Sequence, residues 1–140
     1  MIIIDASVAV KWFVPEPGSG EAEALIDADN ARAAPKHLAV EVAQALLRHY
    51  RAGGVTRTHI DKSLRTLRKV VRDLPTPWLL DDAVEISAAC RCSVYDALYV
   101  AAADRWDCRV VTADAKLKGK VEGSKWSGRI LLLRTSPVDH

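Results

Sequence analysis

Short apolar runs alternate with longer helical patterns along most of this chain. Strands are predicted at 2–4, 31–34, 78–80, 109–112 and 130–133. Helices are predicted at 6–13, 37–51, 58–74, 83–89, 93–106 and 114–120, and a further helix is predicted to begin at Ser19. Strands that alternate with helices are typical of βαβ units. The sequence therefore predicts an α/β fold, with a central, mostly parallel five-stranded sheet flanked by helices.

The length and composition are consistent with a single domain over residues 1–140. Hydrophobic residues make up 49% of the chain, which is enough for a full core. The longest apolar runs are too short to span a bilayer, and the N-terminus does not resemble a signal peptide. We therefore expect a cytoplasmic protein without a membrane partner.

One part of the chain is strongly basic. Between Gln44 and Leu74 there are eight Lys or Arg residues and two acids. Such an excess of positive charge would attract a polyanion such as nucleic acid. It could equally be the solvated face of two helices, so this feature alone leaves both interpretations open.

Four acids stand where an acid is least expected. Asp5 follows the first strand, Glu41 lies inside an apolar helix, Asp96 begins an alanine-rich helix, and Asp114 follows the strand that ends at Thr112. Each has a simple explanation as a helix cap, a first-turn acid or a solvent-facing side chain. However, Asp5 and Asp114 both lie at the carboxyl edge of the predicted sheet, where open parallel sheets bind ligands.

A convergence of these carboxylates would predict a metal site. Clustered carboxylates repel one another unless a cation joins them. Because no His or Cys cluster accompanies them, a set of oxygen ligands favours Mg²⁺ or Mn²⁺ over zinc. Such an ion lowers the pKa of bound water and neutralises charge on a phosphoryl group, so the pattern suits phosphodiester hydrolysis.

The chain resembles PIN domains, and most closely the VapC toxins of bacterial and archaeal toxin–antitoxin pairs. The resemblance runs from Met1 to about Leu133 and rests on four motifs in order: Ile3-Ile4-Asp5-Ala6-Ser7, Glu41 within the helical segment 38–46, Tyr95-Asp96-Ala97-Leu98-Tyr99, and Val111-Thr112-Ala113-Asp114. It implies a Mg²⁺- or Mn²⁺-dependent endoribonuclease that stops translation by cutting RNA. It also implies a homodimer that is neutralised by a cognate antitoxin protein, which inserts a segment near the active site.

The resemblance assigns roles to individual residues. Asp5, Asp96 and Asp114 are expected to hold the metal, and Glu41 to complete the catalytic pocket through water. Ser7 and Thr112 are expected to support the carboxylates by hydrogen bonding. Gln44 departs from the pattern, because the family usually has asparagine three residues after the glutamate. We expect Gln44 to share a helix face with Glu41.

Other functions fit the residues less well. A haloacid-dehalogenase-type phosphatase needs a second aspartate two residues after the first, where this chain has Ser7. A receiver domain needs an acidic pair at the first strand, where Asp5 stands alone. A non-catalytic PIN-like module that acts only through its antitoxin partner remains the alternative, although the intact acids favour an enzyme.

Overall fold

A five-stranded sheet forms the centre of the molecule in the computed structural model, which describes residues 1–134. The strands are β1 (Ile2–Ile4), β2 (Arg32–Pro35), β3 (Arg72–Leu74), β4 (Arg109–Thr112) and β5 (Ile130–Leu132). Their order in the sheet is β3-β2-β1-β4-β5, and every neighbouring pair is parallel. The predicted α/β fold with a parallel sheet is therefore confirmed.

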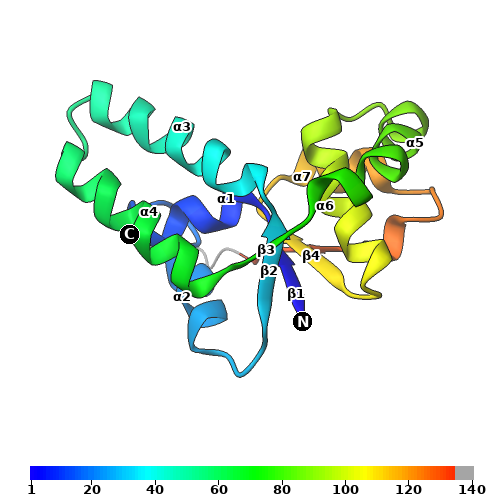
Figure 1. The fold of residues 1–140 in the computed structure, drawn as a ribbon, viewed down its shortest axis with the longest axis horizontal. Helices are drawn as coiled ribbons and strands as arrows, with labels where there is room; N and C mark the ends of the chain where they lie inside the picture. The colour runs from blue at the N-terminus through cyan, green and yellow to red at the C-terminus, as the bar shows by residue number, and fades with distance from the viewer. Residues whose placement is uncertain (135–140) are drawn as a thin grey trace.

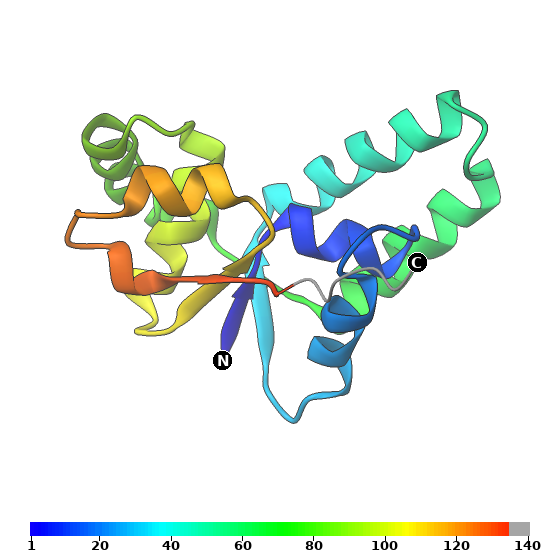
Figure 2. The ribbon, with the colours of Figure 1, turned by 180° about the vertical axis from the view of Figure 1, so that it is seen from behind.

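The helices lie in two groups on either side of the sheet (Figure 1). One group contains α1 (Ala6–Ala9), α2 (Ser19–Asp27), α3 (His37–Arg51) and α4 (Arg57–Val70), and the other contains α5 (Leu80–Cys90), α6 (Val94–Arg105) and α7 (Ala115–Val121). Figure 2 shows α3 and α4 projecting away from the sheet as a helical hairpin. Within residues 1–134, no helix is both long and apolar enough to cross a membrane.

The order of the strands creates a switch point beside β1. The chain leaves β1 for β2 on one side, and β4 later returns to its other side, where Ile4 pairs with Val111. The carboxyl ends of β1 and β4 therefore lie next to each other. In open α/β sheets this is the place where ligands bind.

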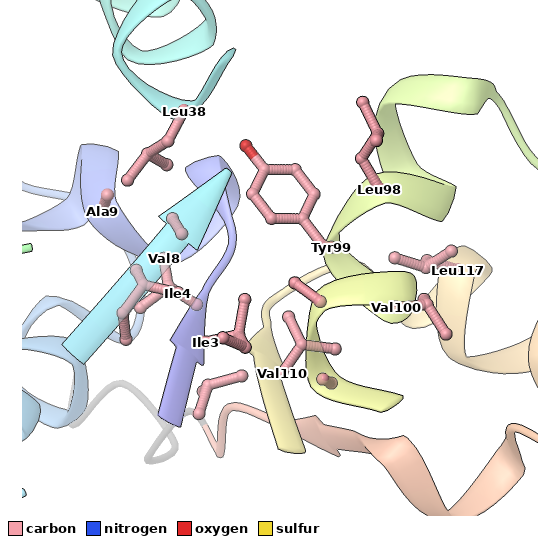
Figure 3. Packing of buried hydrophobic residues seen from close by; sticks show 14 of the residues in the cluster. Ile3, Ile4, Val8, Ala9, Leu38, Leu98, Tyr99, Val100, Val110 and Leu117 are labelled. Atoms are coloured by element: carbon pink, nitrogen blue, oxygen red, sulfur yellow. The ribbon is translucent and has the colours of Figure 1, made fainter. Parts of the chain in front are cut away.

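Helix α6 is the most deeply buried helix of the fold. Its residues 97–103 are all buried, and it packs against β1, β2 and β4. Four of those seven positions are alanine, whose small side chain lets the helix approach the strands closely. Figure 3 shows Tyr99 of this helix extending toward Leu38 of α3, close to Ile4 of β1.

The third strand was predicted in the wrong place. Residues 78–80 do not form a strand: Thr76–Trp78 form a 3₁₀ turn that contains Pro77, and α5 begins at Leu80. The third strand is instead Arg72–Leu74, which was predicted as the end of a helix. Arg72 and Asp73 are exposed, because β3 lies at the edge of the sheet, so its sequence lacks the apolar pattern of a buried strand.

Candidate active site

A cavity of about 760 Å³ opens at the carboxyl ends of β1 and β4. Asp5 reaches it from the end of β1, and Asp114 from the segment that follows β4. Glu41 of α3 and Asp96 in the first turn of α6 line the same cavity. The structure thus brings together the four acids that the sequence singles out, from both groups of helices.

Asp5 is held in place by two hydroxyl groups. Its side chain is buried, and its Oδ2 accepts hydrogen bonds from Thr112 Oγ1 at 2.5 Å and from Ser7 Oγ at 3.0 Å. Asp5 precedes α1, but its carboxylate makes no capping hydrogen bond to that helix. The interpretation of Asp5 as a side-chain cap is therefore wrong, and its carboxylate belongs to the cavity.

The same hydroxyl groups connect the ends of β1 and β4. Ser7 Oγ accepts a hydrogen bond from the backbone N–H of Ala113 at 2.9 Å, and Thr112 Oγ1 accepts one from that of Asp114 at 3.1 Å. Each hydroxyl thus donates its hydrogen to Asp5 and accepts a backbone hydrogen from the segment after β4. This arrangement determines the position of Asp5 relative to Asp114.

Asp96 and Asp114 differ in how they begin their helices. Ser93 caps α6 by accepting from the backbone N–H of Asp96, so the Asp96 carboxylate has no capping role. Asp114 does cap α7, because its Oδ1 accepts from the N–H groups of Lys116 and Leu117. Within residues 1–134, Oδ2 of Asp114 makes no hydrogen bond or ion pair, so it is available to a ligand.

Two further residues surround Glu41, and sequence reasoning missed one of them. The hydroxyl of Tyr99, the last residue of the motif around Asp96, donates to Glu41 Oε1 at 2.7 Å. His37 Nε2 lies 3.3 Å from the same oxygen, and no sequence motif had singled out this histidine. The spacing of His37 and Glu41, one helical turn apart, was the signal that could have found it.

The family comparison agrees with this geometry. The sequence matches the PIN domain family over residues 2–121, which contain all four acids. The chain belongs to the PIN-domain family.

Similar proteins share most of the length of this PIN domain. It is 33% identical to VapC ribonuclease Mb0985 of Mycobacterium bovis over 118 residues, covering 84% of this chain and 88% of that protein. It is 29% identical to Ribonuclease VapC3 of Pyrobaculum aerophilum over 122 residues, covering 85% and 93%. The fold also matches a chain of a toxin–antitoxin complex from Klebsiella pneumoniae, with a TM-score of 0.71, 14% identity and coverage of 97% of this chain and 100% of that chain.

Burial makes the charge on Asp5 unfavourable in this PIN domain. Loss of solvent raises the pKa of its carboxyl group from 3.8 to about 6, although hydrogen bonds from Thr112 and Ser7 favour the charged form. The neighbouring charges of Asp96 and Glu41 raise the pKa further. A carboxylate in this position gains stability from any cation that enters the cavity.

Asp96 experiences the same combination of effects. Burial raises the pKa of its carboxyl group, and the charges of Glu41 and Asp114 add to the increase. Burial also raises the pKa of Tyr99, so its hydroxyl stays protonated and remains a donor to Glu41. The acids therefore gather carboxylate oxygens at one end of a cavity whose lining also includes Lys11 and Arg48.

The donor set of the cavity fits a hard divalent cation. In the described part of the chain, no three His, Cys, Asp or Glu side chains are gathered into a ready-made metal cage. The acids instead surround a wide cavity with room for water. Mg²⁺ typically binds in this way, through one or two carboxylates and several retained water molecules.

Gln44 does not line the cavity, contrary to expectation. The cavity face of α3 carries Glu41, Ala45 and Arg48, whereas Gln44 is exposed. Measured from Glu41 at 100° per residue, the cavity-lining residues of α3 run from about −20° at Arg48 to about +80° at His49, whereas Gln44 lies at about −60°, outside that range. A spacing of three residues from Glu41 was therefore not enough to predict that Gln44 lines the cavity.

The basic segment is largely separate from the cavity. Of its eight Lys and Arg residues, only Arg48 lines the cavity. Arg48 is exposed and makes no ion pair within residues 1–134. The other seven are exposed on α3, α4 and β3, outside the cavity. Most of the positive charge of this segment is therefore not part of the acidic site.

Proposed function

We propose that this protein is a VapC-type toxin that cleaves RNA as an endoribonuclease and thereby inhibits translation. The observation that carries the proposal is the meeting of Asp5, Glu41, Asp96 and Asp114 in one cavity. Both similar proteins described above are named ribonucleases, and they align over most of the chain. The intact acids, together with the raised pKa of Asp5 and Asp96, favour an enzyme over a binding module that acts only through a partner.

We infer that the enzyme depends on Mg²⁺ or Mn²⁺. Asp5, Asp96 and Asp114 would hold the ion, directly or through water, and Glu41 would contact it through water. When bound, the ion would lower the pKa of a water molecule and neutralise charge on the phosphodiester. The raised pKa values of Asp5 and Asp96 support this assignment, because a cation offsets both the burial and the repulsion from neighbouring acids that raise them.

Other side chains would orient the carboxylates that bind the ion and the attacking water. Ser7 and Thr112 orient the Asp5 carboxylate by hydrogen bonds to Oδ2, which leaves Oδ1 for the ion. Tyr99 holds Oε1 of Glu41. Oε2 of Glu41 is then free to orient the attacking water and to accept its proton.

The same proposal includes its partners. A cognate antitoxin would neutralise the toxin by inserting a segment near the acidic cavity; the chain in the Klebsiella pneumoniae complex has the same fold. RNA would be the substrate in the cytoplasm. We further propose that residues 1–140 form a single domain and that two copies form a homodimer.

Cleavage of a structured RNA by the purified protein tests the proposal. We expect cleavage with Mg²⁺ or Mn²⁺, none with EDTA, and a loss of at least about 100-fold in Asp96→Asn. Asp82→Asn is the matched control, because Asp82 is an exposed acid in the first turn of α5, outside the cavity. Undiminished cleavage in EDTA or by Asp96→Asn would exclude this mechanism.

A further inference from the structure

His37 joins the two helices that supply Glu41 and Asp96. Its Nε2 lies 2.9 Å from the backbone carbonyl oxygen of Tyr95 and 3.3 Å from Glu41 Oε1. The carbonyl of Tyr95 belongs to the peptide group that leads into Asp96. One ring nitrogen therefore contacts both the carboxylate from α3 and the backbone at the start of α6.

The surroundings of the ring select one tautomer. A carbonyl oxygen only accepts, so the contact with Tyr95 requires the hydrogen on Nε2 of His37. The other nitrogen, Nδ1, is buried and has no partner within the described residues. A bare Nδ1 is less costly there than a buried N–H without an acceptor. The Nε2–H of His37 is then donated to the carbonyl of Tyr95, with Glu41 Oε1 3.3 Å from the same nitrogen.

Tyr99 supports this arrangement from the interior. Its ring centroid lies 4.6 Å from that of His37, so the two rings pack together. The Tyr99 hydroxyl donates to Glu41 Oε1 at 2.7 Å and is contacted by the backbone amide of Ala6, the residue after Asp5. Figure 3 shows this side chain extending from α6 toward the segment where α3 begins. Oε1 thus accepts a hydrogen bond from Tyr99 and lies 3.3 Å from Nε2 of His37.

We propose that His37 is a positioning residue that holds Glu41 at a set separation from Asp96, with Tyr99 as its support. The inference rests on the proposed nuclease function, in which the carboxylates of Glu41 and Asp96 act on the same RNA substrate. Without the Nε2–H of His37, α3 loses its hydrogen bond to the Tyr95 carbonyl at the start of α6. The side chain of Glu41 then gains conformational freedom. Binding of RNA would not change, since His37 does not line the cavity.

Three substitutions of His37 test this inference by measuring kcat and KM separately. His37→Gln places an amide N–H where Nε2 stood, whereas His37→Asn carries the same amide one methylene short, at the place of Nδ1. We expect His37→Asn and His37→Ala to lower kcat about 10-fold and to change KM less than about twofold, with His37→Gln within about threefold of the wild type. Equal activity of the Gln and Asn variants, or a full loss in both, would overturn the inference.

A second measurement is independent of catalysis. The ¹⁵N spectrum of histidine-labelled wild-type protein without metal, assigned by the signals lost in His37→Gln, reports the tautomer of His37. We expect a single state with hydrogen on Nε2; hydrogen on Nδ1 or averaging between tautomers would overturn the inference. If the wild type cleaves no RNA, the proposed function fails and this spectrum still decides the role of His37. If the wild type cleaves RNA and His37→Asn matches it, only the role of His37 fails.

Discussion

Thr112 donates a 2.5 Å hydrogen bond to Oδ2 of Asp5, across 107 positions of the sequence. Both residues lie at the ends of neighbouring parallel strands, and both are buried. The bond places a charged oxygen inside the protein while leaving the second oxygen of Asp5 for a ligand. The structure thus holds the carboxylate of Asp5 at the edge of the cavity although burial disfavours its charge. The free energy of unfolding should therefore depend on this charge.

Removal of the Asp5 charge is expected to stabilise the metal-free protein at neutral pH. The folded-state pKa of about 6 exceeds the ordinary 3.8, so folding favours the protonated form, and the free energy of unfolding falls as the pH rises from about 4 through 6. In EDTA at pH 8, Asp5→Asn should raise the free energy of unfolding by about 3 kcal/mol. Urea unfolding at pH 8 and at pH 4.5 measures this. A gain at pH 4.5 as large as that at pH 8 would contradict it.

Mn²⁺ is expected to stabilise the folded protein through the same carboxylates. A ligand at 100 times its dissociation constant adds about 2.7 kcal/mol to the free energy of unfolding. The thermal midpoint of the wild type and of Asp82→Asn should rise with MnCl₂, and that of Asp96→Asn should rise much less. Equal shifts in all three proteins would place the ion elsewhere.

Loss of the Thr112 hydroxyl is expected to disturb both acids that it contacts. Thr112→Val keeps the shape of the side chain but leaves the buried Asp5 Oδ2 short of one donor and the partly buried N–H of Asp114 without its acceptor. We expect a loss of about 1–3 kcal/mol in the free energy of unfolding, because a buried polar group then goes unpaired. Thr66→Val is the control, since Thr66 is exposed on α4. Chemical denaturation of both variants gives the comparison, and equal losses would contradict the role of Thr112.

Arg48 is expected to contribute to RNA binding but not to the chemical step. It lines the cavity beside the acids and is exposed, so it is available to a phosphate. Arg48→Ala should raise KM, leave kcat within about twofold, and reduce the slope of log affinity against log salt by about 0.7. Arg51→Ala controls for the loss of one charge outside the cavity. An unchanged salt dependence in Arg48→Ala would show that Arg48 does not bind phosphate.

The errors of sequence-based prediction have physical causes. The strand Arg72–Leu74 carries two exposed charged residues because it lies at the sheet edge, so the apolar pattern of a buried strand is absent. The run Trp78-Leu79-Leu80 has that pattern but enters a helix instead, with only Leu79 fully buried. Burial and secondary structure are separate properties, and apolar periodicity reports mainly the first.

The sequence by itself determined the alternation of strands and helices and the position of Asp5 and Asp114 at the carboxyl ends of strands. These follow from local rules: periodicity, caps and the polarity of parallel strands. Only the tertiary structure decided that Glu41 and Asp96 reach the same cavity, that His37 bridges them and that Gln44 lies outside it. Those relationships depend on how α3 and α6 pack on opposite sides of the sheet. That packing is set by many side chains acting together over distances that no local pattern encodes.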